Sequence, residues 1–286
     1  MKISVSSYSF HQYIGAGKLS QLDCIAKARE MGFDAIEFTD LIAPDYEGQL
    51  ALAKELRNEA EAQGLEINAY TLGANLFKGS DEANAKEVER LKGQLHVARE
   101  LGAPVMRHDV CYGLSKTGKG RSFDLMLPTI AENARKVTEY GAVLGVRTCS
   151  ENHGFVAQDS DRVERLFNAV AHDNYGLLVD VGNFLCVDED PILAVSRLAP
   201  YAIHVHVKDF RWGSDENCNR RIMTRGANYI GGCVLGEGVV PVKQCLAILK
   251  RAGYDGYVSL EYEGVEDCMA GISRGLANLK SFLSSI

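Results

Sequence analysis

The sequence predicts an α/β protein whose strands and helices form a closed (β/α)₈ barrel. First, eight short runs of high β-propensity alternate with longer runs whose apolar residues recur at helical spacing. Second, eight strand–helix units divide the 286 residues into units of about 36. Third, no GxGxxG motif follows the first strand, which disfavours the alternative, a doubly wound open sheet.

The expected strands are short and evenly spread along the chain. The first, ISVSSYSF, alternates polar and apolar residues, and its apolar core is too short for a signal peptide, so we expect the protein in the cytoplasm. Because strands that alternate with helices pair in parallel, one parallel sheet closed on itself is expected. The strands are expected at residues 3–10, 34–39, 65–72, 104–110, 146–152, 175–182, 202–209 and 256–263.

Glycines mark the ends of the expected helices. In the first helical stretch, LDCIAKAREMGF, the residues near one face are Leu22, Ile25, Ala26 and Met31. Further helical stretches are residues 46–64, 81–101 and 122–145. A left-handed glycine that stops a helix before the next strand is expected at Gly32, Gly64, Gly102, Gly145 and Gly253. No linker or low-complexity tract interrupts this pattern, so we expect a single domain over residues 1–286.

The composition excludes several classes of protein. Hydrophobic residues make up 46% and charged residues 24%, which is typical of a globular protein, and no apolar run is long enough to span a membrane. The net charge of −7 disfavours binding to nucleic acid, which requires a concentrated basic surface. The eight cysteines form no CxxC pair, so we expect small core residues in a reducing compartment and no cysteine zinc site.

Chemically active residues gather at the ends of four consecutive strands. Barrel enzymes build their sites at the carboxyl ends of their strands. The fifth to eighth strands end in SENH, VDVGN, HVHVKD and LEYE, which places at the same height Glu151, Asp180, His206 and Glu261. Three carboxylates packed together repel one another unless a cation joins them. The sequence therefore predicts a divalent metal site, whose oxygen and nitrogen ligands suit Mn²⁺, Mg²⁺, Co²⁺ or Zn²⁺.

The seventh strand is unusually polar for a strand that looks buried. In AIHVHVKDF, His204, His206 and Lys208 point to one side because side chains alternate with period two. Lys208 is expected near the barrel mouth, where it binds a substrate oxygen or carboxylate or pairs with a neighbouring acidic residue. For His204, which lies deeper, a role in orienting a ligand or reaching substrate and a role in packing both stay open.

These motifs resemble those of a known family. From MGFDAIEF to GYDGYVSLEYEG, nearly the whole chain is similar to the sugar phosphate isomerase/epimerase family, the xylose isomerase-like TIM barrels, and SENHG, VDVGN, HVHVKDF and LGEG carry the resemblance. The family includes ketose 3-epimerases, inosose dehydratase and dehydroshikimate dehydratase. The resemblance implies one Mn²⁺-like ion held by the Glu of ENH, the Asp of DVGN, the His of HVKD and the Glu of LEY, the same four residues that the strand ends indicate.

Two differences from known members limit which branch of the family the sequence resembles. In the epimerases of the family the sixth strand reads Asp-x-x-His and that His contacts substrate, whereas the position here is Asn183. The family also includes a DNA-repair endonuclease with three zinc ions. That site needs more His and Asp ligands at the barrel mouth than this sequence places there, and the acidic charge balance disfavours it.

The metal site and its glutamates predict an isomerase or epimerase of a small sugar or sugar derivative. A metal that binds two adjacent sugar oxygens polarises the carbonyl and acidifies the neighbouring C–H bond. Glu151 and Glu261 would flank the substrate, one removing the proton and the other returning it. Loss of a β-hydroxyl would make the protein a lyase or dehydratase acting on a keto-polyol, and this alternative stays open. A barrel that binds a sugar without turnover is disfavoured, since sugar recognition rarely needs three carboxylates and an ion.

Other strand ends supply candidates for substrate binding. They are His11, Glu37, His108, His153, Asn183, Lys208 and Arg211. Residues 209–238 form a segment longer than the usual βα loop, which is typical of a lid or a binding loop. Anion donors for a phosphate or carboxylate are Arg211, Arg220, Arg221 and Arg225. A contact with a neighbouring subunit is the alternative for this segment, which leaves a homo-oligomer open.

Overall fold

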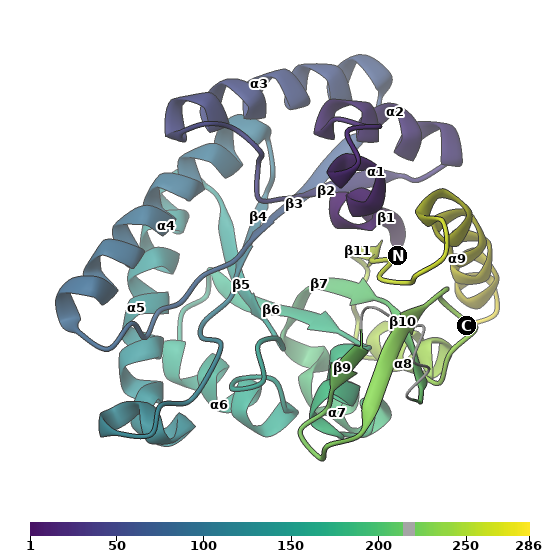
Figure 1. Cartoon of the computed structure of the whole chain (residues 1–286). Helices are drawn as coiled ribbons and strands as arrows, with labels where there is room; N and C mark the ends of the chain where they lie inside the picture. Colours follow the sequence, from purple (N-terminus) through teal and green to yellow (C-terminus); the bar gives the residue numbers. More distant parts are fainter. Residues whose placement is uncertain (214–220) are drawn as a thin grey trace.

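The computed structural model describes residues 1–213 and 221–286, and a closed barrel of parallel strands lies at its centre (Figure 1). The order around the barrel is β1-β11-β7-β6-β5-β4-β3-β2. The strands are β1 (Lys2–Ser6), β2 (Ala35–Thr39), β3 (Glu66–Leu72), β4 (Val105–His108), β5 (Arg147–Glu151), β6 (Tyr175–Asp180), β7 (Ala202–Val207) and β11 (Tyr257–Leu260). All neighbours pair in parallel, which confirms the (β/α)₈ barrel and excludes the open sheet.

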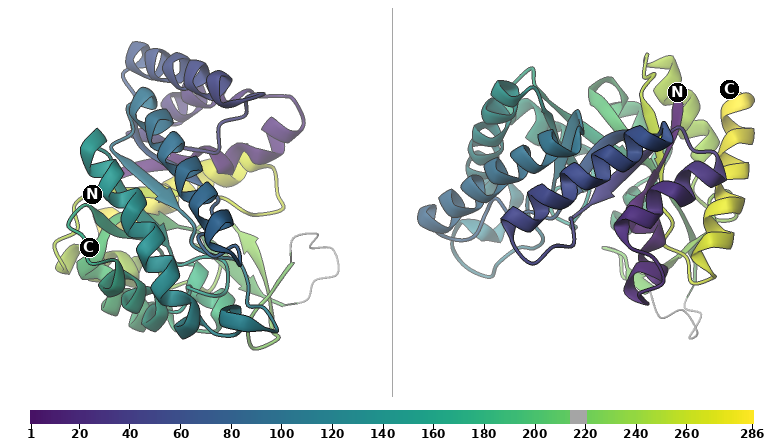
Figure 2. Two further views of the ribbon diagram at one scale, coloured as in Figure 1. Left: turned by 90° about the vertical axis from the view of Figure 1, so that its left-hand side faces the viewer. Right: turned by 90° about the horizontal axis from the view of Figure 1, so that it is seen from above.

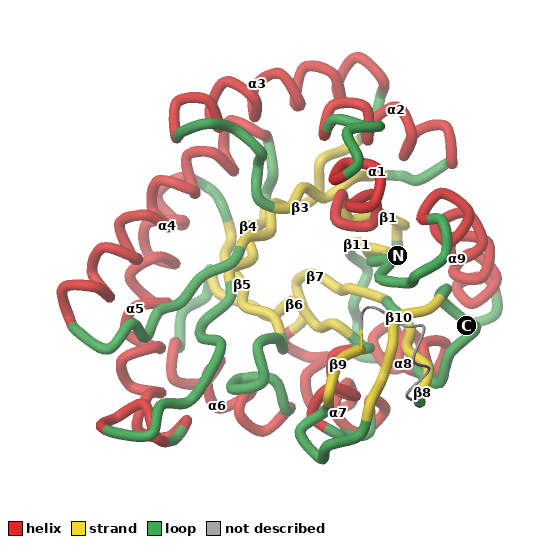
Figure 3. Tube along the Cα trace, in the orientation of Figure 1, coloured by secondary structure: helices red, strands yellow, loops and turns green. Residues whose placement is uncertain are grey.

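The helices form an outer layer around this barrel (Figure 2, Figure 3). They are α1 (His11–Gly15), α2 (Gln21–Met31), α3 (Tyr46–Gln63), α4 (Asp81–Leu101), α5 (Phe123–Leu144), α6 (Ser160–Val170), α7 (Pro191–Leu198), α8 (Val242–Arg251) and α9 (Cys268–Ser284). The helices from α2 to α9 bury apolar side chains toward the strands, whereas α1 has no buried residue; on α4, for example, Leu91 and Leu95 are fully buried. The hydrophobic core therefore lies between the two layers, and the strand ends remain available for polar side chains.

Local signals set the helix boundaries. The Ser80 and Ser122 side chains accept a backbone N–H at the starts of α4 and α5, a cap that stabilises a helix by about 1 kcal/mol. The expected glycine stops of α2, α3, α4 and α5 are confirmed, with positive φ at Gly32, Gly64, Gly102 and Gly145. Helix α8 differs, because it ends at Arg251 and left-handed Gly253 follows its cap.

Most strands end earlier on their carboxyl side than the sequence predicts. The largest difference is in the first strand, where Ser7–Phe10 form the 3₁₀ helix η1 instead of continuing β1. The Ser9 hydroxyl donates to the backbone carbonyl of Leu260 (3.1 Å) and accepts the backbone N–H of Tyr262 (2.9 Å). This hydroxyl thus ties the end of β1 to the end of β11, and turns the chain across the barrel mouth.

The segment at 209–238, expected to be a lid or binding loop, contains a small sheet of its own. Strands β8 (Asp209–Trp212), β10 (Tyr229–Cys233) and β9 (Arg221–Met223) pair antiparallel in that order. The buried Asp209 carboxylate accepts backbone N–H groups from Gly236, Gly238, Val240 and Phe210, at 2.9 to 3.0 Å. One side chain therefore organises both the start and the end of this segment.

Side chains also fasten the turn between β9 and β10 to the barrel. Asp188, just after the 3₁₀ helix η3 (Asn183–Val187), accepts hydrogen bonds from Thr224 (2.8 Å) and Asn228 (3.1 Å). The Arg225 guanidinium pairs with Asp159 (2.9 Å). Within the described part of the segment, this turn is held against the loops that follow β5 and β6, and Arg220 lies outside the described residues.

Two expectations from composition concern the cysteines and the membrane. Each cysteine that the structure describes is free and buried, as expected of small core residues: Cys24, Cys111, Cys149, Cys186, Cys233, Cys245 and Cys268. Cys218 lies outside the described residues. Across residues 1–213 and 221–286, no helix has the length and hydropathy that crossing a membrane requires.

Candidate active site

Four side chains from four neighbouring strands meet at the carboxyl end of the barrel. Glu151 ends β5, Asp180 ends β6, His206 lies near the end of β7, and Glu261 follows β11. The strand register places Asp180 beside His206 and His206 beside Ser259, which brings the strand ends to a common height. All four side chains are buried, and one ligand atom from each lies within 4.8 Å of the others.

The donor atoms of this cluster fit a divalent cation. The His206 Nδ1 atom is buried, lacks a hydrogen-bond partner among the described residues, and lies 3.8 Å from Asp180 Oδ2 and 3.7 Å from Glu261 Oε2. An imidazole nitrogen with three carboxylates is a donor set that Mn²⁺, Mg²⁺, Co²⁺ and Zn²⁺ accept. Burial raises the pKa of Asp180 to about 6; the charge of Lys208 opposes this rise, and the carboxylates of Glu151 and Glu261 add to it.

A buried glutamate stands behind the His206 imidazole. Glu37, at the middle of β2, accepts a hydrogen bond from the other ring nitrogen of His206, Nε2, at 2.9 Å, and the same carboxylate oxygen is hydrogen-bonded to His204 Nε2. Burial alone would raise the pKa of Glu37, but these two imidazoles hold it well below its usual range. Since Nε2 is hydrogen-bonded to Glu37, Nδ1 of His206 faces Asp180 and Glu261, where a bound ion would take the place of the Nδ1 proton.

Lys208 contacts the same cluster on the side of the barrel mouth. Its ammonium lies 3.1 Å from Asp180, 2.5 Å from Glu261 and 2.9 Å from Glu263, and its side chain is 5% exposed. Burial alone would lower the pKa of Lys208, but the charges of Asp180 and Glu261 outweigh it and raise the pKa. Lys208 therefore carries a positive charge that partly balances the carboxylates.

Arg107, which the sequence analysis did not select, lies on the other side of the cluster. Its guanidinium pairs with Glu151 (2.6 Å) and Asp109 (3.3 Å) and donates to the backbone carbonyl of Leu72 (3.2 Å). Asp109 also accepts from His153 Nδ1 at 3.0 Å. The run RHD at residues 107–109 contained the signal, because side chains alternate along a strand and Arg107 and Asp109 share a face that His108 does not.

Hydrogen bonds from two asparagines fix two of the candidate ligands. The Asn183 side-chain amide donates to Glu151 Oε1 at 2.7 Å. The side chain of Asn152, the Asn of ENH, bonds the backbone N–H and C=O of Asp180, at 2.8 and 2.9 Å. These contacts fix the rotamer of Glu151 and the backbone at Asp180, so two of the four candidate ligands are preorganised.

Above the cluster, a pocket of about 320 Å³ opens to solvent; we call it the mouth pocket. Its charged lining residues are Asp40, Arg107, Asp109, Glu151, His153, Lys208, Glu261 and Glu263. Its neutral lining residues are Tyr8, Thr39, Thr71, Leu72 and Gly73. This volume fits a small ligand such as a sugar, and it borders the candidate metal ligands Glu151 and Glu261.

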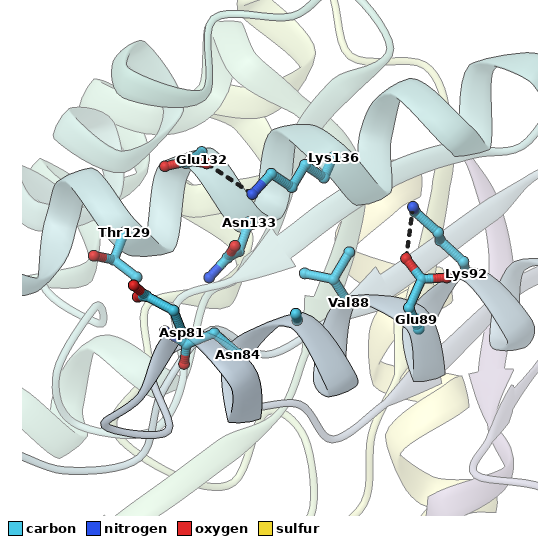
Figure 4. A pocket seen from close by; sticks show the side chains of 10 residues that line it. Asp81, Asn84, Val88, Glu89, Lys92, Thr129, Glu132, Asn133 and Lys136 are labelled. Atoms are coloured by element: carbon cyan, nitrogen blue, oxygen red, sulfur yellow. Dashed lines mark hydrogen bonds and ion pairs between the residues drawn. The ribbon is translucent and has the colours of Figure 1, made fainter.

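A larger hollow, of about 530 Å³, lies between α4 and α5 on the outside of the barrel (Figure 4). Four of its charged side chains form pairs along the helices: Lys92 pairs with Glu89 (2.8 Å) and Lys136 with Glu132 (2.7 Å). Its buried Asn133 donates to the backbone carbonyl of Leu76 at 3.0 Å. This hollow is larger than the mouth pocket, but it lies away from the strand ends and four of its charged side chains are already paired.

Comparison with known proteins identifies the family. The sequence profile of the xylose isomerase-like TIM barrel family matches residues 25–282 of this chain. The chain belongs to this family. Its members among the similar proteins include epimerases and dehydratases, so the family supports an enzyme without selecting the reaction.

Three curated relatives illustrate this range. The rhizopine catabolism protein MocC of Rhizobium meliloti is 24% identical over 253 residues, 84% of this chain and 74% of that protein. The inosose dehydratase of Lacticaseibacillus casei is 24% identical over 47% of this chain and 46% of its own length. The L-ribulose-5-phosphate 3-epimerase UlaE of Escherichia coli is 22% identical over 88% of this chain and 86% of that protein. For the inosose dehydratase, the match thus spans about half of the relative.

Solved structures show the same fold at lower sequence identity. The probable 3-DHS dehydratase AsbF from Bacillus anthracis superposes with a TM-score of 0.75 and 19% identity, over 98% of this chain and 99% of that chain. The IOLI protein, whose crystal structure contains a zinc atom, superposes with a TM-score of 0.74 and 16% identity, over 100% of this chain and 99% of that chain.

The structure brings only part of the expected substrate-binding set to the mouth pocket. His153 and Lys208 line it, and Glu37 and Asn183 lie beneath it, bonded to candidate ligands. Three expected residues are not part of the lining: His11, His108 and Arg211.

Each of these three departures has a physical reason. His11 stacks on Tyr8 and contacts its backbone carbonyl, because η1 turns the chain before His11. His108 points to the opposite face of β4 from Arg107, with its ring fully buried and its Nδ1 bonded to the backbone carbonyl of Asp109. Arg211 pairs with Glu237 (3.1 Å) within the small sheet segment. Trp212 of the same segment lies beside Asp188 and Val239 in a separate hollow.

Proposed function

We propose that the protein is a divalent-metal-dependent isomerase or epimerase of a small keto-sugar or keto-polyol. The observation that carries the proposal is the convergence of Glu151, Asp180, His206 and Glu261 below the mouth pocket. These four residues would hold one ion, for which we propose Mn²⁺, with Mg²⁺, Co²⁺ and Zn²⁺ as alternatives. When bound, such an ion polarises a substrate carbonyl and acidifies the adjacent C–H bond.

The chain's own residues supply the proton transfers. Glu151 and Glu261 line the pocket from β5 and β11, so we assign one as the base that removes the proton and the other as the acid that returns it. Asn183 and Arg107 hold the two oxygens of Glu151, at 2.7 and 2.6 Å, and thereby orient it. Lys208 stands beside Glu261 at 2.5 Å and favours its ionised form.

A dehydratase is the second candidate, and His153 is the observation that favours it. Elimination needs an acid for the leaving hydroxyl in addition to the base. His153 lines the pocket, and although burial alone would lower its pKa, the hydrogen bond and charge of Asp109 raise it above the usual range. The Asn183 that replaces the epimerase histidine, and the similarity to an inosose dehydratase, point the same way.

Deuterium exchange separates these reactions. Neutral keto-sugars and inososes are incubated with the metal-loaded protein in D₂O, the ion is removed with a chelator, and ¹H spectra are recorded. Exchange of a C–H proton without loss of a hydroxyl supports the isomerase or epimerase, whereas appearance of an unsaturated or deoxy product supports the dehydratase. A protein that binds no divalent ion and exchanges no proton in any of these compounds contradicts the proposal.

The glutamates are tested directly by isosteric substitution. Glu151→Gln and Glu261→Gln should each lower turnover by roughly 10²- to 10⁴-fold, because each removes a proton carrier. The matched control is Glu82→Gln on α4, whose side chain is 80% exposed and forms a surface ion pair with Lys86. Near-normal turnover in either pocket variant would mean that the proton carriers lie elsewhere.

A further inference from the structure

Building on the proposed function, we propose that the substrate is an uncharged keto-polyol that carries no phosphate or carboxylate. The relatives do not decide this question, since one is named for inosose and another for L-ribulose 5-phosphate. The inference rests instead on the charges of the described residues that line the mouth pocket. An anionic substrate group would need a lining cation that is not already paired with a carboxylate.

Among the described residues, each cation that lines the pocket has a carboxylate partner that is not a candidate metal ligand. Lys208 pairs with Glu263 at 2.9 Å. Arg107 pairs with Asp109 at 3.3 Å, and His153 shares the same Asp109 at 3.0 Å. When an ion takes over Glu151, Asp180 and Glu261, Lys208 and Arg107 therefore remain neutralised by Glu263 and Asp109.

The remaining charges make the pocket acidic even with the ion in place. The ion offsets only two of the three carboxylate ligands, and Asp40 adds a further carboxylate at the mouth. A phosphate would bring two more negative charges into a pocket whose net charge is already negative. Like-charge juxtaposition of this kind lowers affinity by a factor on the order of 100.

The neutral part of the lining fits hydroxyl groups. Thr71 lines the pocket, and its buried hydroxyl has no hydrogen-bond partner among the described residues. Such a hydroxyl costs stability unless a ligand satisfies it, and it both donates and accepts, as a sugar hydroxyl does. The carboxylates of Asp40 and Glu263 are acceptors for further hydroxyl donors. Thr39 and Tyr8 add two more hydroxyls.

The arginines that would have favoured an anion are occupied elsewhere. In the described part of the segment at 209–238, Arg211 pairs with Glu237, Arg225 pairs with Asp159, and Arg221 lies over the Tyr229 ring. None of these three lines the mouth pocket. The anion site expected from the sequence is therefore not formed by these three residues.

Matched pairs of substrates test the inference. A panel of neutral ketoses and inososes, and the monophosphate ester of each, is assayed for C–H exchange with the full chain loaded with Mn²⁺. The neutral member of the best pair should have the higher kcat/KM, by a factor on the order of 100. Equal or faster exchange of the ester overturns the inference and leaves the proposed function intact. Exchange in neither member of any pair overturns the proposed function and the inference with it.

A charge variant links the discrimination to the pocket. Glu263→Gln releases Lys208 from its outer carboxylate, so the kcat/KM ratio of ester to neutral substrate should rise at least tenfold over wild type. A merely structural role for Glu263 would lower both values together and leave the ratio unchanged, which would overturn the inference. Glu82→Gln, far from the pocket, serves as the control with an unchanged ratio.

Discussion

At the residue scale, the arrangement of Glu37, His204 and His206 explains why a buried strand carries two histidines. One carboxylate from β2 receives both imidazoles, so neither Nε2 is left without a partner inside the barrel. The same contact fixes the His206 tautomer that presents Nδ1 to the carboxylates. Carboxylate–histidine pairs behind a metal site set the orientation and basicity of the ligating imidazole.

Glu37→Gln should weaken Mn²⁺ binding by about 10- to 100-fold, because the neutral amide no longer holds two N–H donors with a full charge. Free Mn²⁺ measured by electron paramagnetic resonance during a titration reports the affinity without any assay of turnover. Urea unfolding of the metal-free variant separates loss of affinity from loss of fold. An unchanged Mn²⁺ affinity in a folded variant would show that Glu37 does not orient His206.

At this scale, the alternation of side chains along strands predicted which residues meet at the strand ends. Contacts between distant strands could not be predicted from the sequence. The heights of Glu151, Asp180, His206 and Glu261 follow from strand ends, and the structure brings these side chains together. Arg107 was not predicted, although it lies on the face of β4 that lines the pocket, whereas the predicted His108 points to the other face. The contacts of Glu37 join β2 to β7, two strands that are not neighbours in the barrel, and no local pattern encodes such a contact.

At the element scale, α4 holds the β3–α4 loop that forms one wall of the mouth pocket. Glu87 accepts the backbone N–H of Asn75 (3.0 Å) and pairs with Arg90 (2.9 Å) and Lys78 (3.0 Å). Arg90 in turn donates to the backbone carbonyl of Gly73, a lining residue, at 2.7 Å. A single buried carboxylate thus connects the helix to the pocket wall.

This arrangement makes Glu87 a source of acid sensitivity. Burial alone would raise its pKa, but Arg90, Asn75 and Lys78 lower it from the ordinary 4.5 to about 2. Because the pKa is lowered on folding, the carboxylate stabilises the fold above its unfolded pKa and loses that contribution as the pH falls toward 2. The shift corresponds to about 3 kcal/mol at neutral pH.

Glu87→Gln should therefore destabilise the protein by about 3 kcal/mol at pH 7, and by less than about half of that at pH 3. Urea unfolding curves of wild type and variant at the two pH values give the comparison. Glu82→Gln, on the exposed face of the same helix, should show little difference at either pH. A stability difference that stays constant with pH would contradict the assignment.

Some element boundaries could be predicted from local sequence patterns and others could not. Glycine stops and serine caps act through the nearest residues, so four helix ends could be predicted. The small sheet within 209–238 could not, because its strands are three to five residues long and depend on Asp209 gathering distant backbone N–H groups. Short polar strands of this kind have no hydrophobic period to detect.

At the scale of the whole molecule, barrel closure pairs the first barrel strand with the last. β1 pairs with β11, and the N-terminal ammonium contacts Asp255 at 2.7 Å. No strand of the barrel has a free edge, so loss of either terminal strand would expose the others. We therefore propose that residues 1–286 unfold as one domain, with the four candidate metal ligands contributed by its C-terminal half.

Metal binding should be visible as stabilisation of that entire unit, because the ligands come from β5, β6, β7 and the end of β11 and separate when the barrel opens. Mn²⁺ at 100 times its dissociation constant should raise the free energy of unfolding by about 2.7 kcal/mol. For a barrel of this size the melting temperature should then rise by about 5 °C. Calorimetry of the chelator-treated protein with and without Mn²⁺ measures this, and Asp180→Asn should lose most of the shift. Two separate transitions would contradict the single unit, whereas one transition that Mn²⁺ does not move would contradict the metal site while leaving the barrel intact.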